Sequence, residues 1–145
     1  MKIDYSNRSY NLLAFVLGAL ILAGVICFIY FLGQSTSKAT EVVLSDTTVE
    51  IRGMFGTSIE YRKIDSIELK DNLPEIGRKN NGSAIGEAHK GNFTVDGLGE
   101  CKLYILSSKG PYLYIKVEGK YIIMNYKDKL TTEKLYDDLL NKWKN

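Results

Sequence analysis

Cysteine, histidine and proline are scarce in this chain of 145 residues, which contains two cysteines, two prolines and one histidine. Cys27 lies inside a long apolar run and Cys101 lies far from it. This spacing excludes a disulfide framework and a C-x-x-C metal site. His89 has no second histidine to share a metal with. The sequence therefore predicts no metal and no cofactor.

An excess of charge is also missing after the first 40 residues. Three of the 19 basic residues and one of the 17 acidic residues lie within residues 1–40, so 16 of each sign remain for the rest of the chain. A domain that binds nucleic acid usually carries a basic excess. We therefore expect no nucleic-acid partner.

Charged residues are absent between Arg8 and Lys38. As a helix with a rise of about 1.5 Å per residue, the apolar stretch Leu12–Leu32 reaches about 31 Å. The hydrocarbon core of a bilayer is about 30 Å thick, and backbone groups in lipid must be hydrogen-bonded within the segment. The sequence predicts an N-terminal tail over residues 1–10, a transmembrane helix over residues 11–33 and a linker over residues 34–40.

A cleavable signal peptide is the alternative for this run, with Lys2 and Arg8 as its charged region and a cleavage site near Ser35–Ala39. The apolar region of a signal peptide normally has about 7–15 residues, fewer than this run contains, so we favour an uncleaved anchor. The excess of Lys2 and Arg8 over Lys38 slightly favours a cytoplasmic N-terminus. The rest of the chain is then expected on the extracytoplasmic side of the cell membrane.

After the linker the apolar residues recur at every second position, which is typical of half-buried strands. About seven short strands are expected. The segments Cys101–Leu106, Tyr112–Val117 and Lys120–Tyr126 are predicted to form consecutive antiparallel hairpins. We interpret the glycine-rich stretch Leu73–Phe93 as a corner of the sheet, with one short strand near Glu87–Phe93.

The last segment changes to helical spacing. Leu135, Leu139 and Trp143 fall on one stripe together with neighbouring apolar residues. The spacing predicts a helix over about residues 131–144, capped by Thr131 or Thr132, which packs its apolar stripe against the sheet.

Several short motifs follow one another in order: Leu73-Pro74, Arg78, Asn81-Gly82, Gly91-Asn92-Phe93, Gly97-Leu98-Gly99, Lys102-Leu103-Tyr104, Ile123-Met124-Asn125 and Thr132 with Leu135-Tyr136. This order resembles the bacterial pleckstrin-homology-like (bacterial PH) domain family. The resemblance implies a mainly β fold of the α+β class, a PH-like, partly open antiparallel barrel closed by one C-terminal helix, over residues 41–145. It also implies a membrane setting, but no known reaction and no catalytic residues.

Two kinds of candidate site stand out. Arg52, Arg62, Arg78 and Lys79 are the candidate ligand-binding residues for anionic lipid or a partner, and Arg52 and Arg62 are expected to converge near the turn Gly53–Gly56. A solvated charged face is the alternative.

The second candidate is a catalytic grouping of His89, Cys101 and Asp96, for which a loop histidine and an inert buried thiol are the alternatives. Lys90-Gly91-Asn92-Phe93 lacks the Gly-Lys-Ser/Thr of a phosphate-binding loop.

Together these features predict a single-pass, membrane-anchored, non-enzymatic binding or assembly module that acts near the bilayer surface. It would bind a protein partner or associate with itself. An anionic-lipid sensor and a membrane-associated hydrolase are the alternative functions.

Overall fold

The computed structural model describes residues 5–144 and, within them, the side chains of residues 10–31, 34 and 38–144. Residues 1–4 of the predicted tail lie outside the described residues. The chain forms two compact units that meet at Ser35 and Thr36. We describe each unit by itself.

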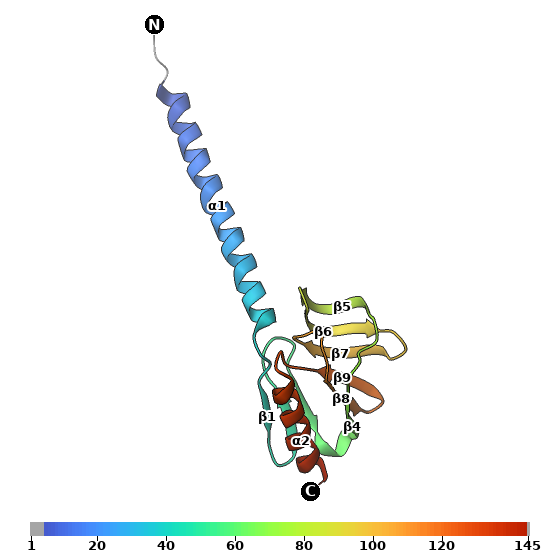
Figure 1. Cartoon of the computed structure of the whole chain (residues 1–145). Helices are drawn as coiled ribbons and strands as arrows, with labels where there is room; N and C mark the ends of the chain where they lie inside the picture. Colours follow the sequence, from blue (N-terminus) through green and yellow to red (C-terminus); the bar gives the residue numbers. More distant parts are fainter. Residues whose placement is uncertain (1–4, 145) are drawn as a thin grey trace. The chain divides into compact units, whose positions relative to one another are not determined.

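The first unit is the helix α1, which spans Tyr5–Ser37 (Figure 1). It extends beyond residues 11–33 at both ends. Its segment Tyr10–Phe31 has 22 residues and a mean hydropathy of 3.0, and is long and apolar enough to cross a membrane. At about 1.5 Å per residue this segment reaches about 33 Å. Its large apolar side chains are exposed in the isolated chain, as expected for a helix whose apolar surface is covered by lipid.

The second unit contains nine strands among the described residues and one C-terminal helix. The strands are β1 (Val42–Leu44), β2 (Thr48–Ile51), β3 (Thr57–Glu60), β4 (Ile64–Lys70), β5 (Ile76–Ile85), β6 (Ala88–Val95), β7 (Gly99–Ile105), β8 (Tyr112–Val117) and β9 (Lys120–Met124), followed by α2 (Lys129–Lys144). A short 3-10 turn, η1 (Tyr61–Lys63), joins β3 to β4. The predicted class, mainly β with a C-terminal helix, is confirmed.

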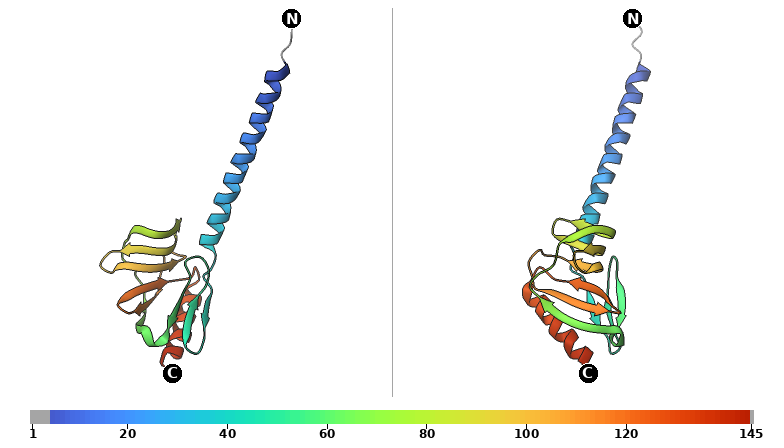
Figure 2. Two further views of the ribbon diagram at one scale, coloured as in Figure 1. Left: turned by 180° about the vertical axis from the view of Figure 1, so that it is seen from behind. Right: turned by 90° about the vertical axis from the view of Figure 1, so that its right-hand side faces the viewer.

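The strands form two sheets (Figure 2). One has the order β1-β2-β3, and the other has the order β4-β8-β9-β7-β6-β5. Neighbouring strands are antiparallel except for β7 and β9, which run parallel. The predicted hairpin between Cys101–Leu106 and Tyr112–Val117 is therefore wrong. The last strand of the chain, β9, lies between the two segments and pairs with both.

Asn125 explains how the chain passes from β7 to β8 around the end of β9. Its side-chain oxygen accepts hydrogen bonds from the backbone nitrogens of Leu106 (2.9 Å) and Ser107 (3.2 Å). Its side-chain nitrogen donates to the carbonyl oxygens of Ser107 (2.9 Å) and Lys109 (3.1 Å). Asn125 is 1% exposed. One buried amide thus replaces the hairpin hydrogen bonds that a direct turn would supply.

The glycine-rich stretch is a hairpin rather than a corner, because β5 and β6 pair along most of it. The two-residue turn Gly86-Glu87 has Gly86 at φ 58°, which glycine adopts without strain. Gly82 and Gly91 are paired across the strands, and a Cβ on either residue would overlap backbone atoms of the opposite strand. The sequence signal for turns here reflects close contact of two strands as well as bending.

Two apolar clusters lie against opposite faces of the six-stranded sheet. The larger cluster joins the two sheets and includes Leu139 of α2, against which Leu135 and Trp143 also pack. The prediction that the helix stripe packs on the sheet is confirmed. The predicted threonine cap is wrong: Asp128 Oδ2 accepts hydrogen bonds from the backbone nitrogen (3.1 Å) and hydroxyl (2.7 Å) of Thr131. These bonds lower the pKa of Asp128.

Candidate functional site

The segment that follows α1 is hydrogen-bonded into the second unit. Lys90 Nζ donates to the carbonyl oxygen of Lys38 (2.6 Å), and the Tyr126 hydroxyl donates to the carbonyl oxygen of Thr40 (2.6 Å). Lys90 and Thr40 are each 5% exposed. Burial lowers the pKa of Lys90, since the charged ammonium loses its water. Residues 38–40 are therefore part of the folded domain.

Arg52 and Arg62 do not converge. Arg52 comes directly after Ile51, at the turn end of the β2–β3 hairpin, where Ile51 pairs with Thr57. Arg62 comes two residues after Glu60, at the open end of the hairpin, where Glu60 pairs with Thr48. The two arginines thus lie at opposite ends of the β2–β3 hairpin. Arg52 is four residues, roughly 13 Å at about 3.3 Å per residue, from the Thr48–Glu60 pair that Arg62 follows.

Both of these arginines have carboxylate neighbours. Arg52 lies 3.3 Å from Glu41 and 3.3 Å from Glu50, and Arg62 lies 2.6 Å from Glu60. The neighbouring carboxylates therefore largely neutralise the positive charges of both arginines.

Arg78 and Lys79 lie together on β5, the edge strand of the six-stranded sheet. Both side chains are exposed. Arg78 Nε donates to the side-chain oxygen of Asn80 (3.3 Å), and neither residue has a carboxylate within 4.0 Å in the described part of the chain. The pairing with β6 is irregular between Ile76 and Asn81 and regular from Asn81 to Ile85.

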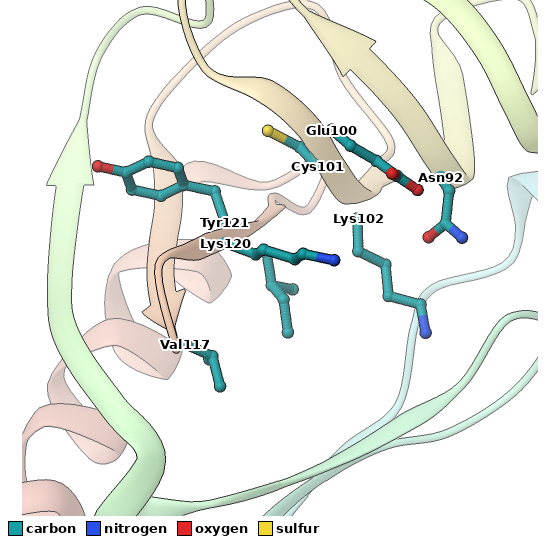
Figure 3. Close-up of a pocket in the computed structure, with 8 residues that line it drawn as sticks. Asn92, Glu100, Cys101, Lys102, Val117, Lys120 and Tyr121 are labelled. Atoms are coloured by element: carbon teal, nitrogen blue, oxygen red, sulfur yellow. The ribbon is translucent and has the colours of Figure 1, made fainter.

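A polar cavity opens on the face of the six-stranded sheet that carries the larger apolar cluster, and we call it the inner-face cavity (Figure 3). Its volume is about 230 Å³. In Figure 3 the polar ends of Asn92, Glu100, Lys102 and Lys120 turn toward one space, whereas the Tyr121 ring points away from it. The four side chains come from β6, β7 and β9.

The strand register explains why polar residues gather at this place. One row across the sheet pairs Asn92 with Lys102 and Lys102 with Ile122. The row continues through apolar residues, because Ile122 pairs with Ile115 and Ile115 with Ile67. The inner face is therefore apolar over β4, β8 and the end of β9, and polar at Asn92 of β6 and Lys102 of β7. Tyr104, farther along β7, belongs to the larger apolar cluster.

The adjacent row places two charges side by side. Cys101 pairs with Tyr121 in the parallel β7–β9 ladder, so the preceding residues Glu100 and Lys120 are neighbours on the inner face. They are nevertheless more than 4.0 Å apart, since no ion pair joins them. Within the described residues no carboxylate lies within 4.0 Å of Lys102 or Lys120. Burial lowers the pKa of Lys102.

Asn92 and Lys102 occur in the short motifs of the sequence, but neither they nor Glu100 and Lys120 were predicted as site residues. Lys102 belongs to a strand whose alternation is clear, with Cys101 and Leu103 on the opposite face. Alternation places Asn92 and Lys102 opposite the apolar residues Phe93, Cys101 and Leu103, which is typical of solvent-facing positions, so the sequence carries no local signal for the cavity. Recognising it requires the β6–β7 register.

His89 and Cys101 do not form a catalytic pair. In the β6–β7 ladder Cys101 pairs with Phe93, and His89 pairs with Ile105 four positions away. His89 Nδ1 lies 3.1 Å from the carbonyl oxygen of Glu87. Cys101 is 1% exposed, and burial raises the pKa of its thiol. Such a thiol is protonated and shielded from substrates.

A second cavity, of about 410 Å³, lies beside the end of the β2–β3 hairpin and is lined by Asp46, Thr47, Glu60, Tyr61 and Arg62. Its charged groups are paired, with Arg62 on Glu60 and Lys142 on Asp46 (3.0 Å). Because its charges already have partners, we regard it as a weaker candidate than the inner-face cavity.

Metal-binding groups do not cluster in residues 5–144: no set of three or more His, Cys, Asp or Glu side chains is placed to hold an ion.

Comparison with known proteins gives one family. Residues 40–131 match the sequence model of the family described as "Bacterial PH domain". No curated protein and no solved structure matches the chain.

Proposed function

The chain belongs to the bacterial PH domain family over residues 40–131, and from this premise we propose that it is a single-pass, membrane-anchored, non-enzymatic binding or assembly module. The fold and an apolar helix long enough to cross a bilayer support a membrane-associated PH module. The partner would be another protein or a second copy of this chain.

The observation that carries the proposal is the short connection between the apolar segment and the domain. The segment ends at Phe31, and the carbonyl oxygen of Lys38 already accepts a hydrogen bond from Lys90. Six residues, 32–37, separate them. Such a chain reaches at most about 25 Å even when fully extended, so a domain anchored by α1 stays close to the bilayer surface.

The edge of β5 is the surface that we propose for the partner. Exposed strand edges bind extended segments by adding a strand to the sheet. Ile85 pairs with Ala88 to close the turn, and Ala84 pairs with His89. In an antiparallel ladder, hydrogen-bonded and non-hydrogen-bonded pairs alternate. The pair that closes the two-residue turn, Ile85 with Ala88, is the hydrogen-bonded kind, so the next pair, Ala84 with His89, is the other kind. The N–H of Ala84 therefore points away from β6, toward the open edge.

The experiment combines photo-crosslinking in native membranes with two substitutions at Ala84. A photoreactive residue replaces Lys79, and mass spectrometry identifies the cross-linked neighbours. Ala84→Pro removes the outward N–H and is expected to abolish the cross-links, whereas Ala84→Val keeps the N–H and is expected to retain them. Cross-links that persist in the proline variant would exclude the β5 edge.

Anionic lipid is the second candidate ligand, and Arg78 and Lys79 favour it because they are exposed and have no carboxylate within 4.0 Å in the described residues. Arg52 and Arg62 would contribute less, because each is paired with glutamates. Each basic group near an anionic surface contributes about 1 kcal/mol. Replacing Arg78 and Lys79 by glutamine should therefore weaken binding to anionic vesicles roughly 30-fold. Equal flotation of variant and parent protein would remove this candidate.

The domain is proposed to lie on the extracytoplasmic side of the cell membrane, on the basis of Lys2 and Arg8 in the N-terminal flank. A membrane-impermeant maleimide should label Lys109→Cys in intact cells and Ser6→Cys only after permeabilisation. The reverse pattern would place the domain in the cytoplasm and leave the anchor itself unaffected.

A further inference from the structure

The inner-face cavity combines three polar groups that can donate hydrogen bonds with one carboxylate that can only accept them. The ammonium groups of Lys102 and Lys120 and the side-chain amide of Asn92 are the donors, and the Glu100 carboxylate is the acceptor. The two lysines contribute two positive charges and Glu100 one negative charge. The cavity therefore carries a net charge of +1 and favours an anionic ligand.

The geometry points to a binding site for a small organic phosphate that also carries a hydroxyl or ammonium donor. The donors come from three different strands, β6, β7 and β9. A carboxylate offers two oxygens in one plane, whereas a phosphoryl group offers three terminal oxygens in a tetrahedral arrangement. A phosphoryl group can accept from all three directions at once.

Glu100 indicates which group the ligand carries beside its phosphate. A carboxylate beside an oxyanion repels it, so a site for a bare anion gains nothing from Glu100. A ligand that presents a hydroxyl or ammonium next to its phosphate turns the same carboxylate into a hydrogen-bond acceptor. Glu100 thus selects a substituted phosphate over inorganic phosphate.

The size of the cavity and its apolar lining agree with such a ligand. Its volume of about 230 Å³ is below the roughly 300–1,000 Å³ of sites for drug-sized molecules. Val117 and Ile122 form its apolar lining, against which a short carbon chain can pack. Lys102 is partly desolvated without a carboxylate within 4.0 Å, and a bound anion would relieve this cost.

The binding test uses the full chain in phosphatidylcholine nanodiscs and isothermal titration calorimetry. The probes are sn-glycerol 3-phosphate, inorganic phosphate and glycerol. We expect glycerol 3-phosphate to bind more tightly than inorganic phosphate, and glycerol to give no heat. Absence of binding by both phosphates would overturn the proposal.

Matched variants locate the site. Lys102→Met and Lys120→Met are each expected to weaken glycerol 3-phosphate binding at least about tenfold, because each removes a charge-assisted hydrogen bond. Lys134→Met removes the same charge from an exposed lysine of α2 outside the cavity and is expected to leave binding unchanged. Equal losses in all three variants would mean non-specific attraction and would overturn the site. Lys120 is exposed, so its variant carries the test even if Lys102→Met unfolds.

Glu100→Gln separates the two halves of the ligand. The variant is expected to bind inorganic phosphate several-fold more tightly and to lose its preference for glycerol 3-phosphate. An unchanged preference would overturn the role of Glu100.

The source of the phosphate is distinguished in a further arm of the experiment. Nanodiscs that contain phosphatidic acid present the same phosphate monoester on a lipid. Competition by these nanodiscs that is lost in Lys120→Met assigns the site to a lipid headgroup, and absence of competition assigns it to a soluble phosphate. This test does not involve the β5 edge, so its outcome is independent of the proposed partner.

Discussion

The ammonium nitrogen of Lys90 lies 2.6 Å from the carbonyl oxygen of Lys38, which is 52 positions earlier in the chain. Lys90 is the third residue of β6, close to the turn of the β5–β6 hairpin, and Lys38 is the first residue after α1. This hydrogen bond joins the segment that follows α1 to strand β6 of the six-stranded sheet.

Lys90→Met should loosen this connection. A hydrogen bond from a charged group contributes about 1.5–3 kcal/mol, so opening of residues 38–41 should become roughly tenfold or more frequent. Trypsin cleaves after lysine, and Lys38 provides the cleavage site. In detergent solution we expect faster cleavage at Lys38–Ala39 in the variant, with Lys134→Met as the control. An unchanged rate would show that Tyr126 and β1 alone hold the segment.

The same lysine predicts a dependence of stability on pH. Burial lowers the pKa of Lys90 in the folded state below that of an unfolded lysine, about 10.4. In the window between these two pKa values the unfolded state binds more protons, so the folded state gains stability as the pH rises. Wild type should therefore gain stability relative to Lys90→Met across this window in urea titrations. A difference between the two proteins that does not change with pH would contradict the buried, desolvated ammonium.

Asn125→Ala should strongly destabilise the second unit. The substitution leaves the buried backbone nitrogens of Leu106 and Ser107 without their acceptor. Each buried unpaired group costs about 1–3 kcal/mol, so we expect a loss of roughly 3 kcal/mol in the free energy of unfolding. Asn72→Ala is the control, because its side chain is exposed and its carbonyl, which accepts from Tyr114 (2.9 Å), is retained. Equal effects of both substitutions would refute the bridging role of Asn125.

Asp128→Ala should remove the N-terminal cap of α2. Loss of a capping carboxylate typically costs about 1 kcal/mol, which chemical denaturation can measure. Asp138→Ala, at an exposed position within the same helix, should change stability by less. If Thr131→Ala proved more damaging than Asp128→Ala, the cap assignment would be wrong.

The sequence predicted the parts of this fold that depend on local pattern. The apolar run, the alternating strands and the helical stripe of Leu135, Leu139 and Trp143 each follow from the period of the hydrophobic residues. The order of short motifs predicted the family, which the match over residues 40–131 confirms.

Features that depend on pairing over long distances were not accessible from the sequence. The parallel pairing of β7 with β9 needs a connection that returns past Asn125, and no local turn signal distinguishes it from a hairpin. The glycine-rich stretch was interpreted as a corner, whereas Gly82 and Gly91 allow two strands to lie in close contact. A bend and a close contact between strands both favour glycine, so the sequence does not distinguish them.

The candidate site was predicted least well. Basic residues could be identified in the sequence, but whether each has an acid beside it depends partly on strand pairing. Arg52 meets Glu41 because Val42 pairs with Ile51. Lys102 and Lys120 have no carboxylate within 4.0 Å in the described residues. The concave surface that gathers Asn92, Glu100, Lys102 and Lys120 exists only after three strands have been assembled.

The central position of β9 has a consequence for biosynthesis. The strand that joins β7 to β8 in the sheet is the last one to leave the ribosome. Until Met124 has been translated, the two segments on either side of β9 have no common neighbour, and the apolar side chains that pack against Ile122, Ile123 and Met124 lack this cover. The nascent domain therefore needs protection from aggregation for nearly its whole length. A chain that terminates before this point cannot complete its larger sheet.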